Sequence, residues 1–203
     1  MRKLYRFLAL LLVLLLCGCA AGAGTEPADA AEETDGTEET DGAGEAGLTV
    51  QAALTEFSAV TLDGGSFTEE DLAACDVTMV NFWTTTCGPC IREMPELAEY
   101  AAALPENVRL ITVCLDGSGQ EETVREILDE AGFQGITLTG GDGDFPRLCR
   151  AVQYTPTTVF LDAGGSLIGG AVIGGQSDLA GTFTAVLNQV LEFLGKDAIT
   201  LDG

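Results

Sequence analysis

Two cysteines, Cys87 and Cys90, enclose a Gly-Pro pair. Two thiols at this spacing close a small disulfide ring, or leave one thiol exposed to attack a disulfide elsewhere. An apolar run over residues 79–83 precedes the motif, and a helical pattern over residues 91–104 follows it. This order places Cys87 at the N-terminus of a helix, where unpaired N–H groups and the helix dipole favour a thiolate. The thiolate is the species that carries out thiol–disulfide exchange.

A lone C-x-x-C motif has other uses, as half of a zinc site or as a structural disulfide. A tetrahedral zinc site needs two further ligands at suitable spacing. The chain has no histidine, and the other cysteines that follow the N-terminal segments, Cys75, Cys114 and Cys149, are scattered, so the sequence disfavours a zinc site. We expect Cys114, in a Val- and Ile-rich run, to be a buried core thiol. A second disulfide between Cys75 and Cys149 stays open, as do unpaired thiols.

The charge balance excludes several classes of function. The chain has 32 acidic and 9 basic side chains and a formal net charge of −23. No nucleic-acid partner is expected, because phosphate binding needs a basic face. The absence of histidine removes His-dependent catalytic triads, His zinc sites and the C-x-x-C-H haem attachment. An acidic surface favours solubility and cationic partners.

The N-terminus carries an export pattern. Residues 1–6 are basic, and residues 7–16 form an apolar run too short to span a bilayer. The run ends in Leu-Cys-Gly-Cys, which resembles a bacterial lipoprotein processing site that modifies Cys19; Cys17 fits less well because a Leu precedes it. We therefore expect residues 1–19 to be a lipoprotein signal peptide ending at the lipidated Cys19, with acyl chains that hold the protein at a membrane. The alternative is an ordinary secreted protein cut nearby.

Two further parts follow the signal. Residues 20–47 are rich in Ala, Gly, Thr, Asp and Glu, with no aromatic or basic side chain and a near-repeat over residues 34–42. Such a segment buries too little apolar area to offset its ordering entropy, so it is predicted to be a disordered acidic linker. Residues 48–203 suit one domain with a proper core.

Strand-like and helix-like patterns alternate along this domain and predict an α/β sandwich with a mixed sheet. Strands are expected over residues 56–62, 66–67, 77–83, 107–115, 136–138, 157–161 and 166–173. A short helix is expected to begin at a cap at Thr68, and longer helices are expected over residues 91–104, 120–131, 145–152 and 179–194. The helix over residues 91–104 is expected to kink at Pro95.

Two stretches of the chain carry a family resemblance. Residues 81–95, Asn-Phe-Trp-Thr-Thr-Thr-Cys-Gly-Pro-Cys-Ile-Arg-Glu-Met-Pro, are followed by residues 154–162, Tyr-Thr-Pro-Thr-Thr-Val-Phe-Leu-Asp. The pair resembles the TlpA/ResA-like thioredoxins of the AhpC/TSA redoxin superfamily, which are membrane-anchored, extracytoplasmic thiol-disulfide oxidoreductases. The resemblance runs from about residue 56 to the C-terminus. It implies a thioredoxin fold, a three-layer α/β/α sandwich with an N-terminal β-hairpin and a helical insert that residues 120–131 could supply.

The resemblance also implies roles for the site residues. Cys87 would be the nucleophile and Cys90 the resolving thiol of a redox-active disulfide. Thr155 and Pro156 match the family's cis-proline loop, which lies beside the nucleophile and pairs with the backbone of a bound partner. An ordinary trans loop proline is the alternative. Trp83 is assigned to the same substrate-binding region and is expected to pack beneath it.

Glu93 matches the acidic position of the subfamily's C-x-x-C-x-x-E-x-P pattern. Asn81 stands where cytosolic thioredoxins carry a buried Asp, and the resemblance implies that Glu93 takes over proton handling for Cys90. A carboxyl group in a partly apolar site has a raised pKa and can shuttle a proton. The alternative is a solvated surface glutamate. The sequence departs from the family at Thr86, where a Trp is common, which leaves the docking surface less defined.

The implied partners are protein disulfide substrates, a membrane electron-donor protein that re-reduces the dithiol, and the lipid bilayer through Cys19. No cofactor and no metal is expected. The tethered members of the family mostly reduce specific partners, including apocytochrome c thiols during haem attachment. The resemblance therefore implies a reductant outside the cytoplasm, at the bacterial cell surface or in the periplasm.

Two rival functions stay open at this point. A peroxiredoxin expects the pattern P-x-x-x-[TS]-x-x-C; Thr84 fits it before Cys87, but Val80 stands where the proline should be. A non-catalytic, lipid-anchored binding module would keep the fold with an inert disulfide. Disulfide reduction and peroxide consumption assays distinguish these functions.

Overall fold

The described part of the chain is residues 50–201 of a computed structural model. All of these residues belong to one compact unit, residues 44–203. The predicted signal peptide, residues 1–19, and the predicted linker, residues 20–47, lie outside the described residues. Within residues 50–201, every helix is too short or too polar to cross a bilayer.

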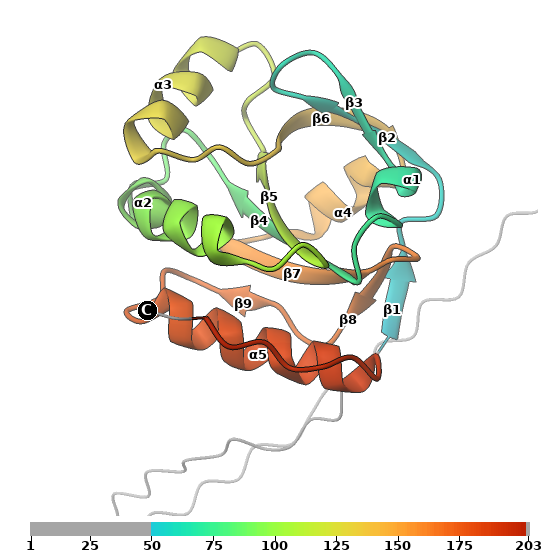
Figure 1. Ribbon diagram of the computed structural model, residues 1–203. Coiled ribbons are helices and arrows are strands. Elements are labelled where there is room, and N and C mark those ends of the chain that lie inside the picture. The colour runs from blue at the N-terminus through green and yellow to red at the C-terminus, as the bar shows by residue number, and fades with distance from the viewer. Residues whose placement is uncertain (1–49, 202–203) are drawn as a thin grey trace, which may run out of the picture. The chain divides into compact units, whose positions relative to one another are not determined.

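The centre of the molecule is a nine-stranded mixed sheet in the order β1-β8-β7-β4-β5-β6-β2-β3, with β9 pairing with β7 (Figure 1). The pairs β4–β5 and β5–β6 are parallel, and the other pairs are antiparallel. The strands are β1 (Val50–Ala53), β2 (Phe57–Thr61), β3 (Ser66–Thr68), β4 (Val77–Trp83), β5 (Val108–Cys114), β6 (Thr137–Gly143), β7 (Thr157–Asp162), β8 (Ser166–Ile168) and β9 (Val172–Ile173).

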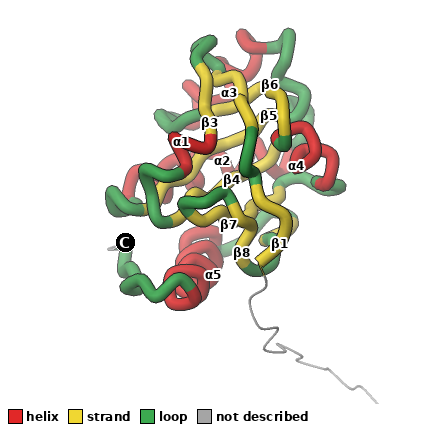
Figure 2. Tube along the Cα trace, turned by 90° about the vertical axis from the view of Figure 1, so that its right-hand side faces the viewer, coloured by secondary structure: helices red, strands yellow, loops and turns green. Residues whose placement is uncertain are grey.

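Helices cover both faces of the sheet (Figure 1 and Figure 2). Successive side chains of a strand point to opposite faces, so Met79 of β4 joins one core and Val80 joins the other. The first core packs against α2 (Gly88–Ala103), α3 (Glu121–Ala131) and α5 (Leu179–Phe193), and the second packs against α1 (Glu69–Leu72) and α4 (Phe145–Ala151). The predicted three-layer α/β/α sandwich is confirmed.

Most predicted elements are present within three residues of their expected bounds, and the sheet differs in three places. The stretch predicted as one strand over residues 166–173 is two strands, β8 and β9, because the backbone turns at Gly169, which has a φ of 76°. Strand β6 runs to Gly143, five residues beyond the predicted end at Leu138, because it pairs along β2. Strand β1 was not predicted; it pairs with β8 at the sheet edge.

The topology brings three chain segments to one end of the sheet. Strand β4 ends at Trp83, and the chain then runs through a short loop into α2. The parallel neighbour β5 ends beside it, with Cys114 paired to Trp83. Strand β7 is antiparallel to β4, so its first residue, Thr157, lies opposite Phe82. The cysteine motif, the end of β5 and the loop before β7 therefore lie close together.

Candidate active site

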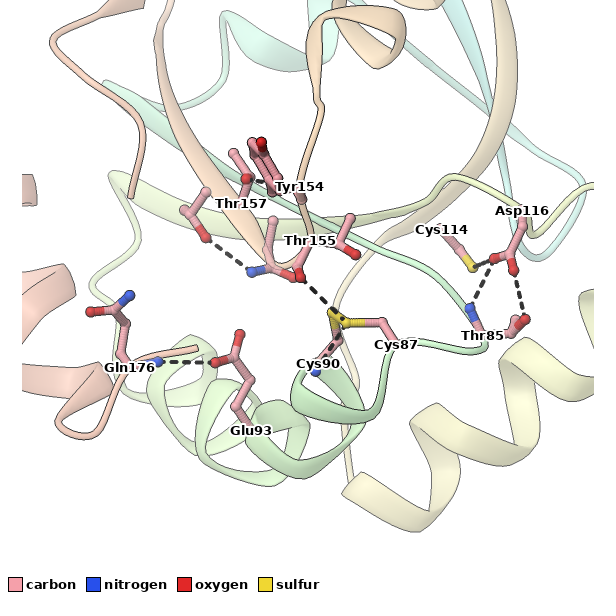
Figure 3. Close-up of a disulfide and its surroundings, with 12 residues drawn as sticks. Thr85, Cys87, Cys90, Glu93, Cys114, Asp116, Tyr154, Thr155, Thr157 and Gln176 are labelled. Atoms are coloured by element: carbon pink, nitrogen blue, oxygen red, sulfur yellow. Dashed lines mark hydrogen bonds between the residues drawn. A yellow bond between two sulfur atoms is a disulfide. The ribbon is translucent and has the colours of Figure 1, made fainter. Parts of the chain in front are cut away.

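The Cys87–Cys90 pair forms a disulfide with an S–S distance of 2.02 Å at the start of α2 (Figure 3). Cys87 is the N-cap of the helix, and its sulfur accepts a hydrogen bond from the Cys90 N–H at 3.2 Å. The prediction for Cys87 at a helix N-terminus is confirmed, and the helix begins at Gly88 because Pro89 suits the first helical turn. Cys87 is half-buried, whereas Cys90 is only 1% exposed.

The loop before β7 faces this disulfide. The Thr155–Pro156 peptide bond is cis, as expected from the resemblance. The Thr155 carbonyl oxygen lies 3.6 Å from the Cys87 sulfur, within reach of a thiol donor when the disulfide is reduced. The loop is held by the Thr157 hydroxyl, which donates to the Tyr154 carbonyl at 2.8 Å, and by Gly174 N–H, which donates to the Pro156 carbonyl at 2.8 Å. A hydrogen-bonded backbone segment therefore borders the sulfur.

Glu93 lies one turn along α2 from the motif and is half-buried. Figure 3 shows its carboxylate turned toward Gln176, whose backbone N–H donates to it at 3.3 Å. Burial raises the pKa of Glu93 from an ordinary value of 4.5 to about 6; the Gln176 hydrogen bond opposes this shift, and the nearby Glu96 carboxylate adds to it. The group is thus not a fully solvated surface glutamate, and it titrates close to neutral pH.

The family model for Redoxin matches residues 49–172, which is more than half of the chain. This chain belongs to the redoxin family. The match spans the disulfide, the cis-proline loop and every strand of the sheet up to the start of β9.

Individual relatives match this redoxin over shorter stretches. It is 32% identical to the thiol-disulfide oxidoreductase ResA of Oceanobacillus iheyensis over 90 residues, which cover 44% of this chain and 45% of that protein. It is 30% identical to a thioredoxin-like protein of Haemophilus influenzae over 103 residues, which cover 51% of this chain and 59% of that protein. The redoxin thus spans about half the length of these curated relatives.

Solved structures share the architecture of this redoxin. The structure of MTB DsbF, in mixed oxidised and reduced forms, superposes with a TM-score of 0.53 at 29% identity, covering 66% of this chain and 98% of that one. A thioredoxin family protein from Chlorobium tepidum superposes with a TM-score of 0.54 at 23% identity, covering 68% of this chain and 95% of that one. The second likeness shows the fold alone.

One assignment of the redoxin's site needs correction. Trp83 packs beneath the motif, in the same core cluster as Cys90, which agrees with the expected position. Its relative exposure is 0%, so it has no surface with which to contact a docked partner. Trp83 supports the site from below and is removed from the substrate-contacting residues. Beside it, the buried Asn81 donates a hydrogen bond to Thr158 at 2.9 Å.

Three exposed apolar side chains of this redoxin belong to the segments around the disulfide: Ile91 at 37%, Ile173 at 59% and Tyr154 at 68% exposure. Ile91 directly follows Cys90, Tyr154 precedes the cis-proline loop, and Ile173 pairs with the first residue of β7. Exposed large apolar side chains near a reactive group suit contact with another protein. Sequence reasoning did not single out these three side chains; Ile173 is brought to this region by the pairing of β9 with β7.

A second polar group lies on the other side of the motif (Figure 3). Asp116 follows β5, and its carboxylate accepts hydrogen bonds from the backbone and hydroxyl of Thr85 and from the thiol of Cys114. Sequence reasoning missed this contact. The available signal was topological: parallel strands end at the same edge of a sheet, so residues just beyond β4 and β5 meet.

The remaining cysteines of the described residues are unpaired. Cys114 is buried, as predicted, and Cys75 and Cys149 are free and partly buried, so the open disulfide between them is not formed. Burial raises the pKa of Cys149 to about 11. These thiols lack the helix N-terminal position that favours a thiolate at Cys87.

Proposed function

We propose that this redoxin is an extracytoplasmic thiol-disulfide oxidoreductase that reduces disulfides in partner proteins. One observation carries the proposal: Cys87 is partly exposed at the N-terminus of α2 and borders the Thr155 carbonyl, while Cys90 is buried behind it. This arrangement offers one sulfur to a partner and holds the second in reserve. The similarity to ResA of Oceanobacillus iheyensis, a thiol-disulfide oxidoreductase, supports the same chemistry.

The reaction is a two-step exchange that starts from the dithiol. The Cys87 thiolate attacks one sulfur of the partner's disulfide, which forms a mixed disulfide and releases the partner's other sulfur as a thiolate. The Cys90 thiol then loses its proton, and its thiolate attacks the Cys87 sulfur. The second partner sulfur leaves, and the Cys87–Cys90 disulfide forms. Two electrons pass from the dithiol to the partner.

Glu93 is the group we assign to the proton of Cys90. With a pKa of about 6, the Glu93 carboxyl is mostly ionised at neutral pH and can act as a base, and it accepts a proton more readily than an ordinary glutamate with a pKa of 4.5. Glu93 follows Cys90 by three residues, about one helical turn, and its half-buried position supports this assignment. The carboxylate accepts the Cys90 proton, directly or through water, as the second step begins.

The surroundings of the sulfur suit a protein substrate. The segments that border the disulfide carry the exposed apolar side chains of Ile91, Tyr154 and Ile173, which suit contact with a protein. The Thr155 backbone offers hydrogen bonds to an extended segment, the mode that the family resemblance implies. Thr155 and Pro156 are therefore the substrate-binding residues of this proposal.

The setting of the enzyme belongs to the same proposal. The lipoprotein pattern at Cys19 would tether it outside the cytoplasm, where disulfides form and persist. A reductant there must itself be reduced, so the proposal includes a membrane electron-donor protein. Apocytochrome c, before haem attachment, is the partner class that the family resemblance suggests.

Disulfide reduction by the purified protein tests the chemistry. With insulin as substrate and dithiothreitol as electron source, the wild type should accelerate reduction, and Cys87→Ser should bring the rate to the uncatalysed background. Cys75→Ser, which removes a free thiol elsewhere, is the matched control and should keep wild-type turnover. A rate that survives Cys87→Ser, or peroxide consumption without disulfide reduction, would contradict the proposal.

The partner is identified by trapping. Cys90→Ser removes the resolving thiol, so the mixed disulfide at Cys87 should persist and be recovered from membranes, then released by dithiothreitol. A reduction potential near −120 mV, typical of strong oxidases, would contradict the direction of transfer, as would trapping only dithiol partners.

A further inference from the structure

Asp116 makes a three-point contact at the base of the loop that carries the nucleophile. Its carboxylate accepts the Thr85 backbone N–H at 2.9 Å, the Thr85 hydroxyl at 2.7 Å and the Cys114 thiol at 3.2 Å. Thr85 and Asp116 are 31 residues apart in the chain. Each lies two residues beyond a paired position, because Trp83 of β4 is in register with Cys114 of β5.

The loop itself is short. Residues 84–86 connect β4 to the N-cap Cys87, and the Cys87 N–H donates back to the Thr84 carbonyl at 3.1 Å. Thr85 is the middle residue of this turn. A group that binds both its backbone and its side chain therefore restricts the conformations open to the whole turn. Two hydrogen bonds to one carboxylate fix orientation as well as position. The position of the Cys87 sulfur follows from this turn on one side and from α2 on the other.

We propose that Asp116 is a positioning residue for Cys87, a role that rests on the proposed exchange function. It clamps Thr85 from the neighbouring strand and thereby keeps the Cys87 sulfur aligned with the helix N–H groups and the Thr155 carbonyl. Asp116 touches neither a partner nor the reacting sulfur. It acts through the loop.

The charge state of the group agrees with this role. Burial alone would raise the pKa of Asp116, but the hydrogen bonds from Thr85 and Cys114 outweigh it and hold the pKa below its ordinary value. The group is thus an ionised acceptor at neutral pH. Charge-assisted hydrogen bonds of this kind are stronger than neutral ones.

The clamp also gives the buried Cys114 a role. Burial, followed by its contact with the Asp116 carboxylate, raises the pKa of Cys114 to about 12. Cys114 therefore stays a thiol and acts as a hydrogen-bond donor to Asp116. It does not compete with Cys87 as a nucleophile, because the thiolate is the reacting species.

The test measures the reactivity of Cys87 directly. The reduced protein is alkylated with iodoacetamide from pH 5 to pH 9, and the rate at Cys87 is followed by peptide mass spectrometry. We expect Asp116→Ala to slow alkylation at pH 7 and insulin reduction about tenfold, because the sulfur loses its alignment. We expect Asp116→Asn to stay within about threefold of wild type, because the amide can accept from the Thr85 N–H and donate to its hydroxyl.

Three further variants keep the test decisive. Thr85→Val removes only the hydroxyl contact with Asp116 and should slow alkylation of Cys87 about threefold. Thr85→Ser keeps a hydroxyl at this position and should alkylate at the wild-type rate. These two variants test the positioning role if Asp116→Ala does not fold. Asp144→Ala is the matched control, since the Asp144 carboxylate likewise holds the backbone and hydroxyl of a threonine, Thr55. It should reduce the melting temperature and leave the pH profile at Cys87 unchanged.

Two results would overturn the inference. One is a wild-type alkylation profile in both Asp116→Ala and Thr85→Val. The other is an equal slowing in Asp144→Ala, which would show a general loss of stability. Alkylation is read at Cys87 whether or not the protein reduces insulin, so failure of the proposed function would not be mistaken for failure of the clamp.

Discussion

At the scale of single residues, the two sulfur atoms of the motif differ in their access to solvent. Cys87 is partly exposed and Cys90 is 1% exposed, although both belong to one short motif. The difference arises because an N-cap residue lies outside the helix, whereas the third helical residue already faces the core. Only one end of the disulfide is therefore open to a partner, which would give the proposed exchange reaction its order.

Glu93 makes the stability of the protein depend on pH. Its folded pKa of about 6 lies above the ordinary 4.5, so the folded state keeps a proton that the unfolded state has lost. Stability therefore falls as the pH rises through this window. Well below pH 4.5 Glu93 is protonated in both the folded and the unfolded state, and the pH dependence of stability due to this group vanishes. Well above pH 6 Glu93 is ionised in both states, and the folded state bears the full cost of a half-buried carboxylate.

We predict that Glu93→Gln removes this dependence. At pH 7 the oxidised variant should be more stable than wild type by about 1 kcal/mol, after allowing for partial exposure. At pH 4 the two proteins should be equally stable. Urea denaturation at both pH values gives the comparison, with Glu99→Gln on the exposed side of α2 as the control. Equal stability differences at the two pH values would contradict the prediction.

At the scale of elements, the pairing of β2 with β6 depends on a glycine. Ala59 of β2 is in register with Gly141 of β6. A Cβ atom at Gly141 would lie 2.6 Å from the Ser58 carbonyl oxygen and 2.8 Å from the Ala59 Cα. These are backbone atoms, which cannot move without shifting the strand. The neighbouring Gly140 has open space around the same position.

We predict that Gly141→Ala destabilises the protein by roughly 1–3 kcal/mol, because the strands must separate to admit the methyl group. Gly140→Ala, one residue away in the same strand, should have little effect. Urea denaturation midpoints of the two variants provide the measurement. Similar losses in both variants would mean that glycine flexibility, and not close approach, explains the effect.

At the scale of the whole molecule, the chain combines a strongly acidic composition with a membrane-address pattern. Its net charge of −23 opposes adsorption to anionic lipid headgroups, so electrostatic attraction does not hold it at a membrane. The membrane attachment that we propose would therefore depend on acyl chains. Two or more chains give stable attachment, whereas one gives reversible binding.

We predict that Cys19→Ser releases the protein from the membrane. Expressed in a bacterium with lipoprotein processing, the wild type should sediment with membranes, and the variant should appear in the soluble extracytoplasmic fraction or remain unprocessed. Cys17→Ser should still sediment, because that residue lies within the predicted signal peptide and is expected to be removed with it. Fractionation and immunoblotting provide the measurement. Sedimentation of Cys19→Ser as a processed protein would contradict the lipid anchor.

Local patterns predicted much of the molecule. Cys87 at a helix start, the buried strand β4 and the amphipathic helices α3 and α5 follow from spacing and periodicity, and these act over a few residues. The cis bond at Pro156 came from a resemblance spanning two distant stretches. The split between β8 and β9 was missed because glycines in a strand pattern do not by themselves show which strand each half will pair with.

The amino-acid sequence by itself determined that the Cys87–Cys90 pair stands at the start of a helix and which kinds of element surround it, because caps, turns and hydrophobic periodicity are local. Only the tertiary structure decided that Asp116 holds Thr85, that Gln176 meets Glu93 across 83 residues, and that Trp83 has no exposed surface. These contacts depend on the order in which strands join the sheet. Strand order is set by burial of the whole core, and no short stretch of sequence encodes it.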